Sequence, residues 1–124
     1  MKRLIIGVAL VLSVLNTGAW AEGDAKAGKK VFKKCKACHT VKEGKNKVGP
    51  TLYGIVDAPA GQVEGFKYSP ALLEAGLTWD AETLKAFLTK PKELVPGNKM
   101  SFAGLKKEQQ IDDLIAYLVA ESEE

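Results

Sequence analysis

The chain is 124 residues long, with 46% hydrophobic and 27% charged residues and a formal net charge of +3. This composition is ordinary for a globular protein and excludes a disordered, collagen-like or coiled-coil chain, and the length fits one domain. The two cysteines, Cys35 and Cys38, are too few and too close together to form the disulfide framework of a small secreted protein. The pair must therefore serve another purpose.

Residues 1–21 have the pattern of an export signal. A basic start is followed by a nearly uninterrupted apolar run over residues 4–15, and the segment ends in Ala19-Trp20-Ala21, whose small residues signal peptidase recognises. The run is short for a membrane-spanning helix, which needs about 20 apolar residues. We therefore predict cleavage after Ala21, a mature domain over residues 22–124 in the periplasm, and no permanent membrane anchor. An uncleaved anchor is the alternative interpretation.

Lysines are distributed unevenly along the rest of the chain. Two of the 18 basic residues, Lys2 and Arg3, lie in the predicted signal, which leaves 16 lysines, no arginine and 15 acidic residues, a formal net charge of +1. Nine lysines lie between Lys26 and Lys47, whereas the C-terminal end is acidic. Lysine runs are commonly just a solvated face. Without arginine and with few aromatic residues among the lysines, binding to nucleic acid has little support.

Helix signals dominate, and no segment keeps a strand period for long. Asp24 is placed to cap a first helix. Ser69 is placed to cap a short helix with Pro70 at its first position, which continues over residues 71–75 and stops at Gly76. Asp80 is expected to cap a helix that Pro91 ends, and the last helix is expected from about Lys106 to Ala120. The residues expected to face inward are Ala27, Val31 and Cys35 in the first helix, Leu84, Phe87 and Leu88 in the third, and Ile111, Leu114, Ile115 and Leu118 in the last.

Two long irregular loops separate these helices, over residues 44–66 and 91–104. Loops of more than about a dozen residues are uncommon in a compact domain of this size unless they are functional. Short helices are also marginally stable on their own. We therefore expect an apolar cofactor to lie between the segments and to replace part of the core.

The segment Cys35-Lys36-Ala37-Cys38-His39 carries the chemistry. C-x-x-C-H is the pattern of covalent haem c attachment: each thiol adds to one vinyl group of the porphyrin, and the histidine binds the iron. A thioredoxin-like pair would need a βαβ setting, structural zinc would need four ligands, and a disulfide across so small a loop would add little stability. The pattern predicts one covalently bound haem c with His39 as an axial ligand.

The sixth iron ligand is predicted by elimination. His39 is the only histidine, and Met100 is the only methionine left after the signal peptide is removed. Met100 lies in the second long loop, after the Pro96-Gly97 turn, where a methionine that only filled the core would be out of place. A thioether suits low-spin iron and raises the reduction potential. With both axial positions filled by the protein, electron transfer is favoured over oxygen or peroxide chemistry.

Several segments in one order resemble class I cytochrome c, the small soluble type of bacteria and mitochondria, including the cytochrome c2 and c550 type. These segments are CKACH, KVGPTLYGIV, the surroundings of Trp79, PKELVPGNKMSFAGL and DDLIAYL, and the resemblance covers nearly all of residues 23–120. It implies an all-α cytochrome c fold of short helices and long loops around one haem, with the first and last helices crossing near Gly28, Phe32, Leu114 and Tyr117.

The resemblance also implies roles for three further residues. The Pro50 carbonyl would accept a hydrogen bond from His39 and fix the imidazole, and Tyr68 and Trp79 would bind a haem propionate. The alternative for the two aromatic residues is ordinary core packing. Phe87, Leu72 and Ala58 depart from the mitochondrial pattern, and each removes a polar group from the haem surroundings.

We thus expect a periplasmic, monomeric electron carrier that is not an enzyme. Its partners would be redox proteins with acidic docking surfaces, such as a cytochrome bc1-type donor, a terminal oxidase, a reaction centre or a dehydrogenase. The lysines that match the family's docking face are Lys33, Lys34, Lys47, Lys92, Lys99, Lys106 and Lys107. The alternatives are a dedicated haem c subunit of one periplasmic dehydrogenase or oxidase, a haem-based ligand-binding or sensor protein, and a thiol redox protein.

Overall fold

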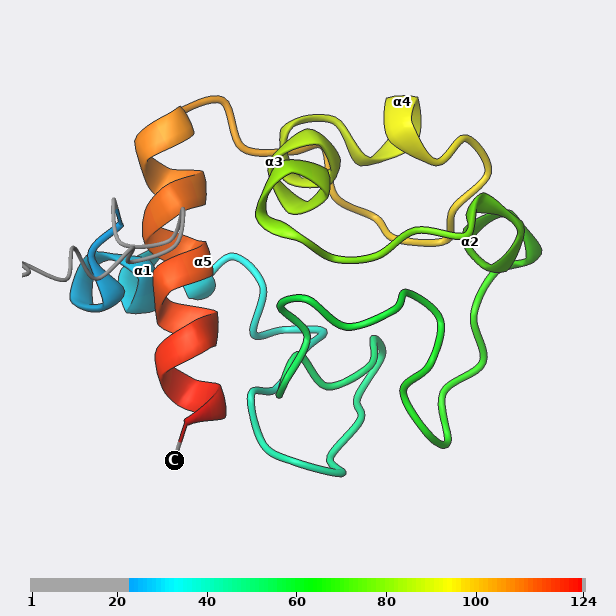
Figure 1. The fold of residues 1–124 in the computed structure, drawn as a ribbon, viewed down its shortest axis with the longest axis horizontal. Helices are drawn as coiled ribbons and strands as arrows, with labels where there is room; N and C mark the ends of the chain where they lie inside the picture. The colour runs from blue at the N-terminus through cyan, green and yellow to red at the C-terminus, as the bar shows by residue number, and fades with distance from the viewer. Residues whose placement is uncertain (1–22, 124) are drawn as a thin grey trace, which may run out of the picture.

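The computed structural model describes residues 23–123, so the predicted signal peptide over residues 1–21 lies outside the described residues. Helices are the regular elements within this range: α1 (Ala25–Phe32), α2 (Pro70–Ala75), α3 (Ala81–Thr89), α4 (Pro91–Leu94) and α5 (Glu108–Ser122) (Figure 1). The only pairing of strand type among the described residues is an isolated antiparallel bridge between Pro59 and Thr78. The predicted all-α class is confirmed.

Side-chain caps start three of the helices as the sequence predicts. Asp24 accepts a hydrogen bond from the backbone N–H of Lys26, and Ser69 accepts one from Leu72. Asp80 likewise accepts the N–H of Thr83 at 2.8 Å. These bonds satisfy N–H groups that have no partner inside a helix. The hydrogen bond from Thr83 lowers the pKa of the Asp80 carboxyl below its ordinary value.

The region after Pro91 differs from the prediction. Residues 91–104 were expected to be irregular, but Pro91–Leu94 form one helical turn, and the loop begins at Val95. Proline suits the first position of a helix because its φ is already helical and the missing N–H is not needed there, so Pro91 both ends α3 and starts α4. α5 begins and ends two residues later than expected. Leu84 is buried as predicted, whereas Phe87 and Leu88 are only half-buried.

The two terminal helices cross and pack closely. Gly28 of α1 lies against the backbone of α5, where a Cβ atom would overlap the carbonyl oxygen of Asp113. The rings of Phe32 and Tyr117 lie beside this crossing with centroids 5.4 Å apart. The backbone N–H of Asp24 donates to the Asp113 carboxylate at 2.9 Å, which fixes the start of α1 on α5. The crossing implied by the family resemblance is therefore present in the structure.

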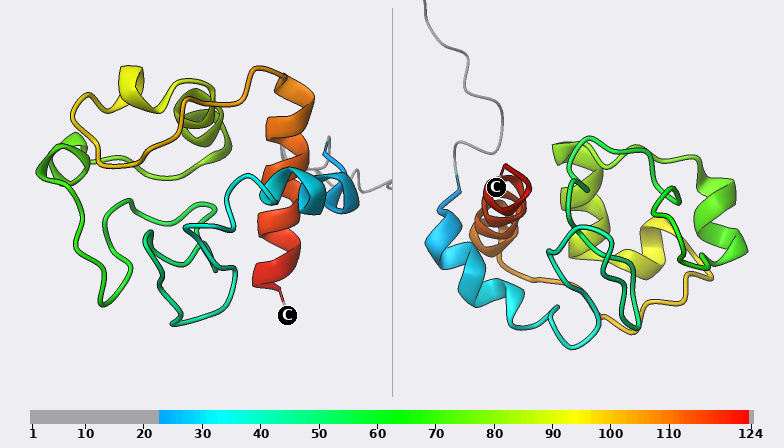
Figure 2. Two further views of the ribbon diagram at one scale, coloured as in Figure 1. Left: turned by 180° about the vertical axis from the view of Figure 1, so that it is seen from behind. Right: turned by 90° about the horizontal axis from the view of Figure 1, so that it is seen from below.

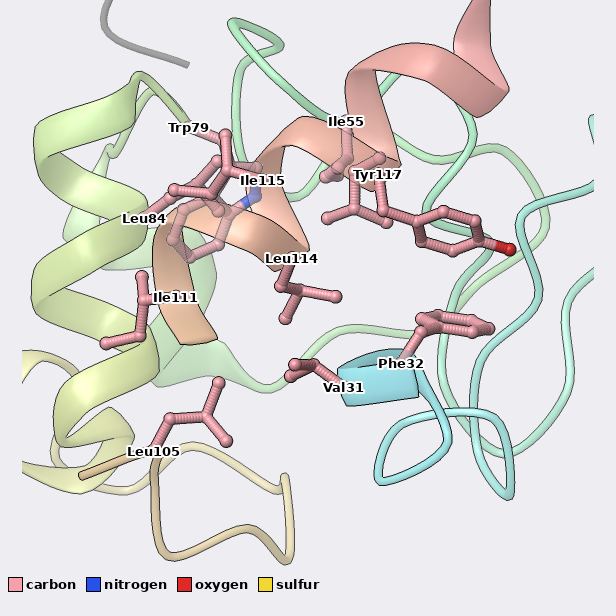
Figure 3. Packing of buried hydrophobic residues seen from close by; sticks show 11 residues of the cluster. Val31, Phe32, Ile55, Trp79, Leu84, Leu105, Ile111, Leu114, Ile115 and Tyr117 are labelled. Carbon is pink, nitrogen blue, oxygen red and sulfur yellow. The ribbon is translucent and has the colours of Figure 1, made fainter. Parts of the chain in front are cut away.

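The hydrophobic core follows α5 along its length. Leu114 and Ile115 are almost fully buried, and Figure 3 shows Leu114 lying between the side chains of α1 and those of α3. The other members of the core come from α1, α3, α5 and the loops between the helices: Val31, Phe32, Ile55, Trp79, Leu84, Leu105, Ile111, Tyr117 and Leu118.

Away from the crossing, the chain separates into two groups of segments. In Figure 1 the loop after α1 runs below, while α3, α4 and the loop after α4 run above. α5 closes one end of this arrangement and α2 lies at the other, and the view from below in Figure 2 agrees. The Cys35–His39 segment belongs to the lower group, and Met100 belongs to the upper group. The fold therefore holds the two predicted iron ligands on separate segments.

Candidate functional site

The Cys35–His39 segment is a tight turn that continues directly from α1. The N–H of Cys38 donates to the carbonyl of Cys35 at 3.1 Å, and the N–H of His39 donates to the same carbonyl at 2.9 Å. Both cysteines are free thiols; Cys35 is half-buried and Cys38 is exposed. Burial raises the pKa of the Cys35 thiol, and nearby Lys34 partly opposes this effect. The turn thus fixes two unpaired thiols and an imidazole by backbone hydrogen bonds.

His39 is oriented by a hydrogen bond to the next loop. Its Nδ1 lies 2.7 Å from the carbonyl oxygen of Pro50. A carbonyl only accepts, so Nδ1 carries the hydrogen and the lone pair of the neutral ring is on Nε2. Burial lowers the pKa of His39, and the bond to Pro50 partly opposes this. A neutral imidazole with its other nitrogen fixed by a backbone carbonyl is the arrangement that metal-binding histidines adopt.

Gly49 is a residue of this site that the motif does not reveal. A Cβ atom at Gly49 would lie 2.8 Å from Nδ1 and 2.9 Å from Nε2 of His39, well inside the ordinary contact distance. Only a residue without a side chain therefore allows the backbone to lie against the imidazole. The Gly49 N–H also donates to the Cys38 carbonyl at 2.8 Å, which ties this loop to the cysteine turn.

The loop that carries Pro50 is held by a polar cluster. The Thr51 hydroxyl donates to the Lys42 carbonyl at 2.6 Å, and the Thr51 N–H donates to the side chain of Asn46 at 2.9 Å. Thr51 is buried, so these bonds are shielded from water. The position of the Pro50 carbonyl, and with it that of the imidazole, therefore depends on the fold of the whole loop.

Met100 reaches the site from the loop between α4 and α5. Its side chain is half-buried. The far end of the loop is fixed by the Leu105 N–H, which donates to the Leu88 carbonyl at 2.7 Å. Gly104, with φ +111°, lies so close to the Thr89 carbonyl that a Cβ would overlap its oxygen. The loop is thereby tied to the end of α3 just beyond Met100.

Tyr68 and Trp79 each have a hydrogen-bond donor that no other residue within 23–123 is seen to use. The Tyr68 hydroxyl oxygen accepts the N–H of Val63 at 3.0 Å, so its own hydrogen remains available. Burial raises the pKa of Tyr68, which keeps the phenol protonated. Trp79 is 6% exposed, and its backbone pairs with residues 57 and 58. Within residues 23–123, no hydrogen bond of its indole N–H is observed.

Half-buried apolar side chains from both groups of segments pack against the core. They include Leu52 and Val56 from the lower group and Phe87 and Phe102 from the upper group. The Phe87 ring also packs on Trp79 with centroids 4.8 Å apart. A large planar apolar group would cover such side chains from both sides, so the residues present fit the cofactor that the cysteine turn predicts.

A separate surface hollow of about 560 Å³ lies between α3, α4 and the start of α5. None of the predicted site residues lines it. Charged side chains in and beside it pair with one another: Lys85 lies 2.9 Å from Asp112, and Lys90 lies 3.6 Å from Glu93.

Among the described residues, no helix is long and apolar enough to cross a membrane. In the same range, no three histidine, cysteine, aspartate or glutamate side chains gather as they would around a metal ion.

Together the fold and the cysteine turn define a small helical haem-binding protein, and comparison with known proteins identifies its family. The cytochrome c family matches residues 25–121. The chain is 44% identical over 119 residues to cytochrome c2 of Blastochloris viridis, with 95% of this chain and 92% of the relative covered. It is 53% identical over 97 residues to cytochrome c2 of Rhodoblastus acidophilus, covering 77% of this chain and 91% of that protein.

A solved structure agrees with these relatives. Cytochrome cH from Methylobacterium extorquens is 52% identical and superposes with a TM-score of 0.75, covering 79% of this chain and 99% of that one. The chain therefore belongs to the cytochrome c family. It carries one covalently attached haem c and functions as an electron carrier, as the sequence predicts.

Proposed function

We propose that this protein is a periplasmic electron carrier whose haem is attached through Cys35 and Cys38 and whose iron is bound by His39 and Met100. The observation that carries the proposal is the pairing of His39 Nδ1 with the Pro50 carbonyl at 2.7 Å, which leaves Nε2 as the ligand atom. Both thiols are free within one turn of this histidine, as thioether formation requires.

Two protein ligands make the site suited to electron transfer. The haem supplies a one-electron couple between Fe(III) and Fe(II). His39 is held by its loop through Pro50, and Met100 is held by a loop whose far end is tied to α3. Ligands that are fixed in advance need little rearrangement when the charge on the iron changes. The half-buried apolar side chains on both sides exclude water and favour the reduced state.

Tyr68 and Trp79 are proposed to bind a haem propionate. The Tyr68 hydroxyl already accepts a hydrogen bond from Val63, which orients its remaining hydrogen. The indole N–H of Trp79 has no observed acceptor within residues 23–123 and is available to donate. A carboxylate accepts from both groups, which would hold the charged edge of the haem inside the fold.

Export to the periplasm is proposed from the N-terminal pattern. The basic start, the short apolar run and the Ala19-Trp20-Ala21 ending support cleavage after Ala21 and a mature chain that begins at Glu22. The intact mass and N-terminal sequence of the protein purified from the periplasm test this proposal. A protein that starts at Met1 and remains in the membrane fraction would contradict it.

Docking with acidic redox partners is proposed from the lysines. All seven of the lysines that match the family's docking face are exposed. Lys33 and Lys34 lie in the turn between α1 and the attachment site. Changing both to glutamate should slow association with an acidic partner and reduce its dependence on salt, as measured by stopped-flow electron transfer. Equal rates and salt dependence in the two proteins would contradict this role.

The test of the haem site uses spectra of the exported protein made together with haem-attachment machinery. Haem that stays with the polypeptide after denaturing extraction would support attachment through Cys35 and Cys38. A weak far-red sulfur-to-iron band in the native oxidised protein would support Met100 as a ligand. Retained haem without this band, together with rapid carbon monoxide binding when reduced, would contradict Met100 ligation and point to ligand binding. Loss of the haem on extraction would contradict covalent attachment.

A further inference from the structure

The side chain of Asn98 uses three hydrogen bonds to fix the loop that carries Met100. Its Nδ2 donates to the carbonyl of Pro91 at 3.0 Å and to the carbonyl of Val95 at 2.9 Å. Its Oδ1 accepts the backbone N–H of Met100 at 2.9 Å. Both amide hydrogens and the amide oxygen are therefore engaged, and the side chain is half-buried.

The two donated bonds connect the loop to deeply buried residues. Pro91 and Val95 are among the most deeply buried residues described. The Pro91 carbonyl already accepts the Val95 N–H at 3.0 Å, and the Asn98 amide is a second donor to it, so the side chain reinforces the single turn of α4. The chain also reverses here, because Gly97 has φ +86° and the Asn98 N–H donates to the Val95 carbonyl at 3.2 Å.

The accepted bond transmits this anchoring to Met100. An asparagine that accepts the N–H two residues later forms an Asx turn, which restricts the backbone between them. The Met100 backbone is thereby tied through one side chain to Pro91 and Val95, the two buried ends of the segment 91–95. Nothing in the sequence motif distinguishes Asn98 from any other polar loop residue.

We propose that Asn98 is a positioning residue that holds Met100 in place as the iron ligand. This inference rests on the proposed ligation of the iron by Met100. Asn98 acts through the Met100 backbone and not by contact with the haem. Without it, the loop keeps its tie at Leu105 but loses the one described side-chain bond to the Met100 backbone, so the ligand leaves the iron more often. A competing external ligand then binds the ferric iron more tightly, since it displaces Met100 at lower cost.

The test compares three variants of the holoprotein. Asn98→Ala removes all three bonds, and Asn98→Ser keeps an oxygen that can accept the Met100 N–H. The matched control is Ser122→Ala: Ser122 is a half-buried residue at the end of α5 whose hydroxyl accepts the Gly54 N–H at 2.7 Å and donates to the Leu118 carbonyl at 2.9 Å, and neither bond involves a predicted iron ligand or a residue that fixes one. Each protein is titrated with imidazole in the ferric state, the sulfur-to-iron band is recorded, and unfolding in guanidinium is measured.

Asn98→Ala is expected to bind imidazole about tenfold more tightly than the parent protein, the change that loss of one or two hydrogen bonds from a local equilibrium gives. Asn98→Ser is expected to lie between the two. Ser122→Ala should unfold at lower guanidinium concentration but bind imidazole like the parent protein. If Asn98→Ala yields no holoprotein, the difference between Asn98→Ser and the parent decides the question.

Two results would overturn the inference. Imidazole affinity within twofold of the parent protein for the Asn98 variants would show that the loop holds Met100 without this side chain. An equal increase in Ser122→Ala would show a general loss of stability instead of positioning. Both results apply to a parent protein that shows the sulfur-to-iron band, so they would refute the role of Asn98 and leave Met100 ligation standing. Absence of that band in the parent protein itself would overturn the proposed Met100 ligation, and with it the role of Asn98.

Discussion

Replacing Gly28 with alanine should destabilise the protein, although alanine is the better helix former. Gly28 lies where α1 crosses α5, and an added Cβ would lie 2.6 Å from the Asp113 carbonyl carbon and 2.7 Å from the Tyr117 Cβ. Ordinary contacts of this kind are 3.4–4 Å. The helices would therefore have to separate by about 1 Å, because the atoms in the way are backbone atoms and a Cβ attached directly to the backbone, and none of them can rotate aside.

The loss in free energy of unfolding can be estimated from the contacts between α1 and α5 that the separation would weaken. Val31 and Phe32 are buried at this crossing, and a gap of about 0.5–1 Å forfeits about a quarter to a half of their dispersion contacts. Together with the overpacking itself, the loss is about 3 kcal/mol. The higher helix propensity of alanine stabilises the variant by about 1 kcal/mol and offsets part of this loss. We therefore expect a net loss of about 2 kcal/mol, with valine at the same position worse than alanine.

Guanidinium unfolding of the holoprotein, followed by far-ultraviolet circular dichroism, measures this directly. With a slope of about 3 kcal/mol per M for a domain of this size, the midpoint should fall by about 0.7 M. Lys29→Ala is the control, because Lys29 is the exposed neighbour of Gly28 in α1. A Gly28→Ala midpoint at or above that of the parent protein would refute the reasoning, since helix propensity would then outweigh the crossing.

Three further changes test other contacts. Gly49→Ala should displace the His39 imidazole, weaken its bond to the backbone and raise the reduction potential by tens of millivolts in a spectroelectrochemical titration; an unchanged potential would show that the ring tolerates the methyl group. Ser122→Ala removes the hydroxyl that accepts the Gly54 N–H at 2.7 Å and should cost about 1 kcal/mol in guanidinium unfolding. Asp80 has a lowered pKa in the folded state, so its stabilising effect is complete above its ordinary value of 3.8 and is lost as the pH falls through the lower folded value. The stability difference between the parent protein and Asp80→Asn should therefore be constant above about pH 5 and shift in favour of the variant below pH 3.8; a difference independent of pH would contradict the cap.

Much of the fold could be predicted from the sequence because its signals are local. The caps at Asp24, Ser69 and Asp80 act on N–H groups two or three residues away, so residue type and spacing suffice to locate the helix starts. The limits of α5 were less well predicted, since no side chain caps its start at Lys107. The helical turn at Pro91 was missed because proline both ends one helix and suits the start of the next.

The cofactor also follows from the sequence alone. Cys35, Cys38 and His39 lie within five residues, so the covalent attachment chemistry is encoded in one turn whatever the rest of the chain does. The choice of Met100 likewise needed only a count of possible ligands. Its role in binding the iron remains a prediction until the spectra are recorded.

Only the tertiary structure decided how these residues are held. Gly49 lies against His39, Asn98 binds the Met100 backbone and two buried carbonyls, and Gly28 lies against α5. Glycine and asparagine occur in any loop, and their type does not say which distant atom they approach. Such contacts depend on the packing of segments that the sequence does not pair, because the distances involved are set by the whole fold and not by neighbours along the chain.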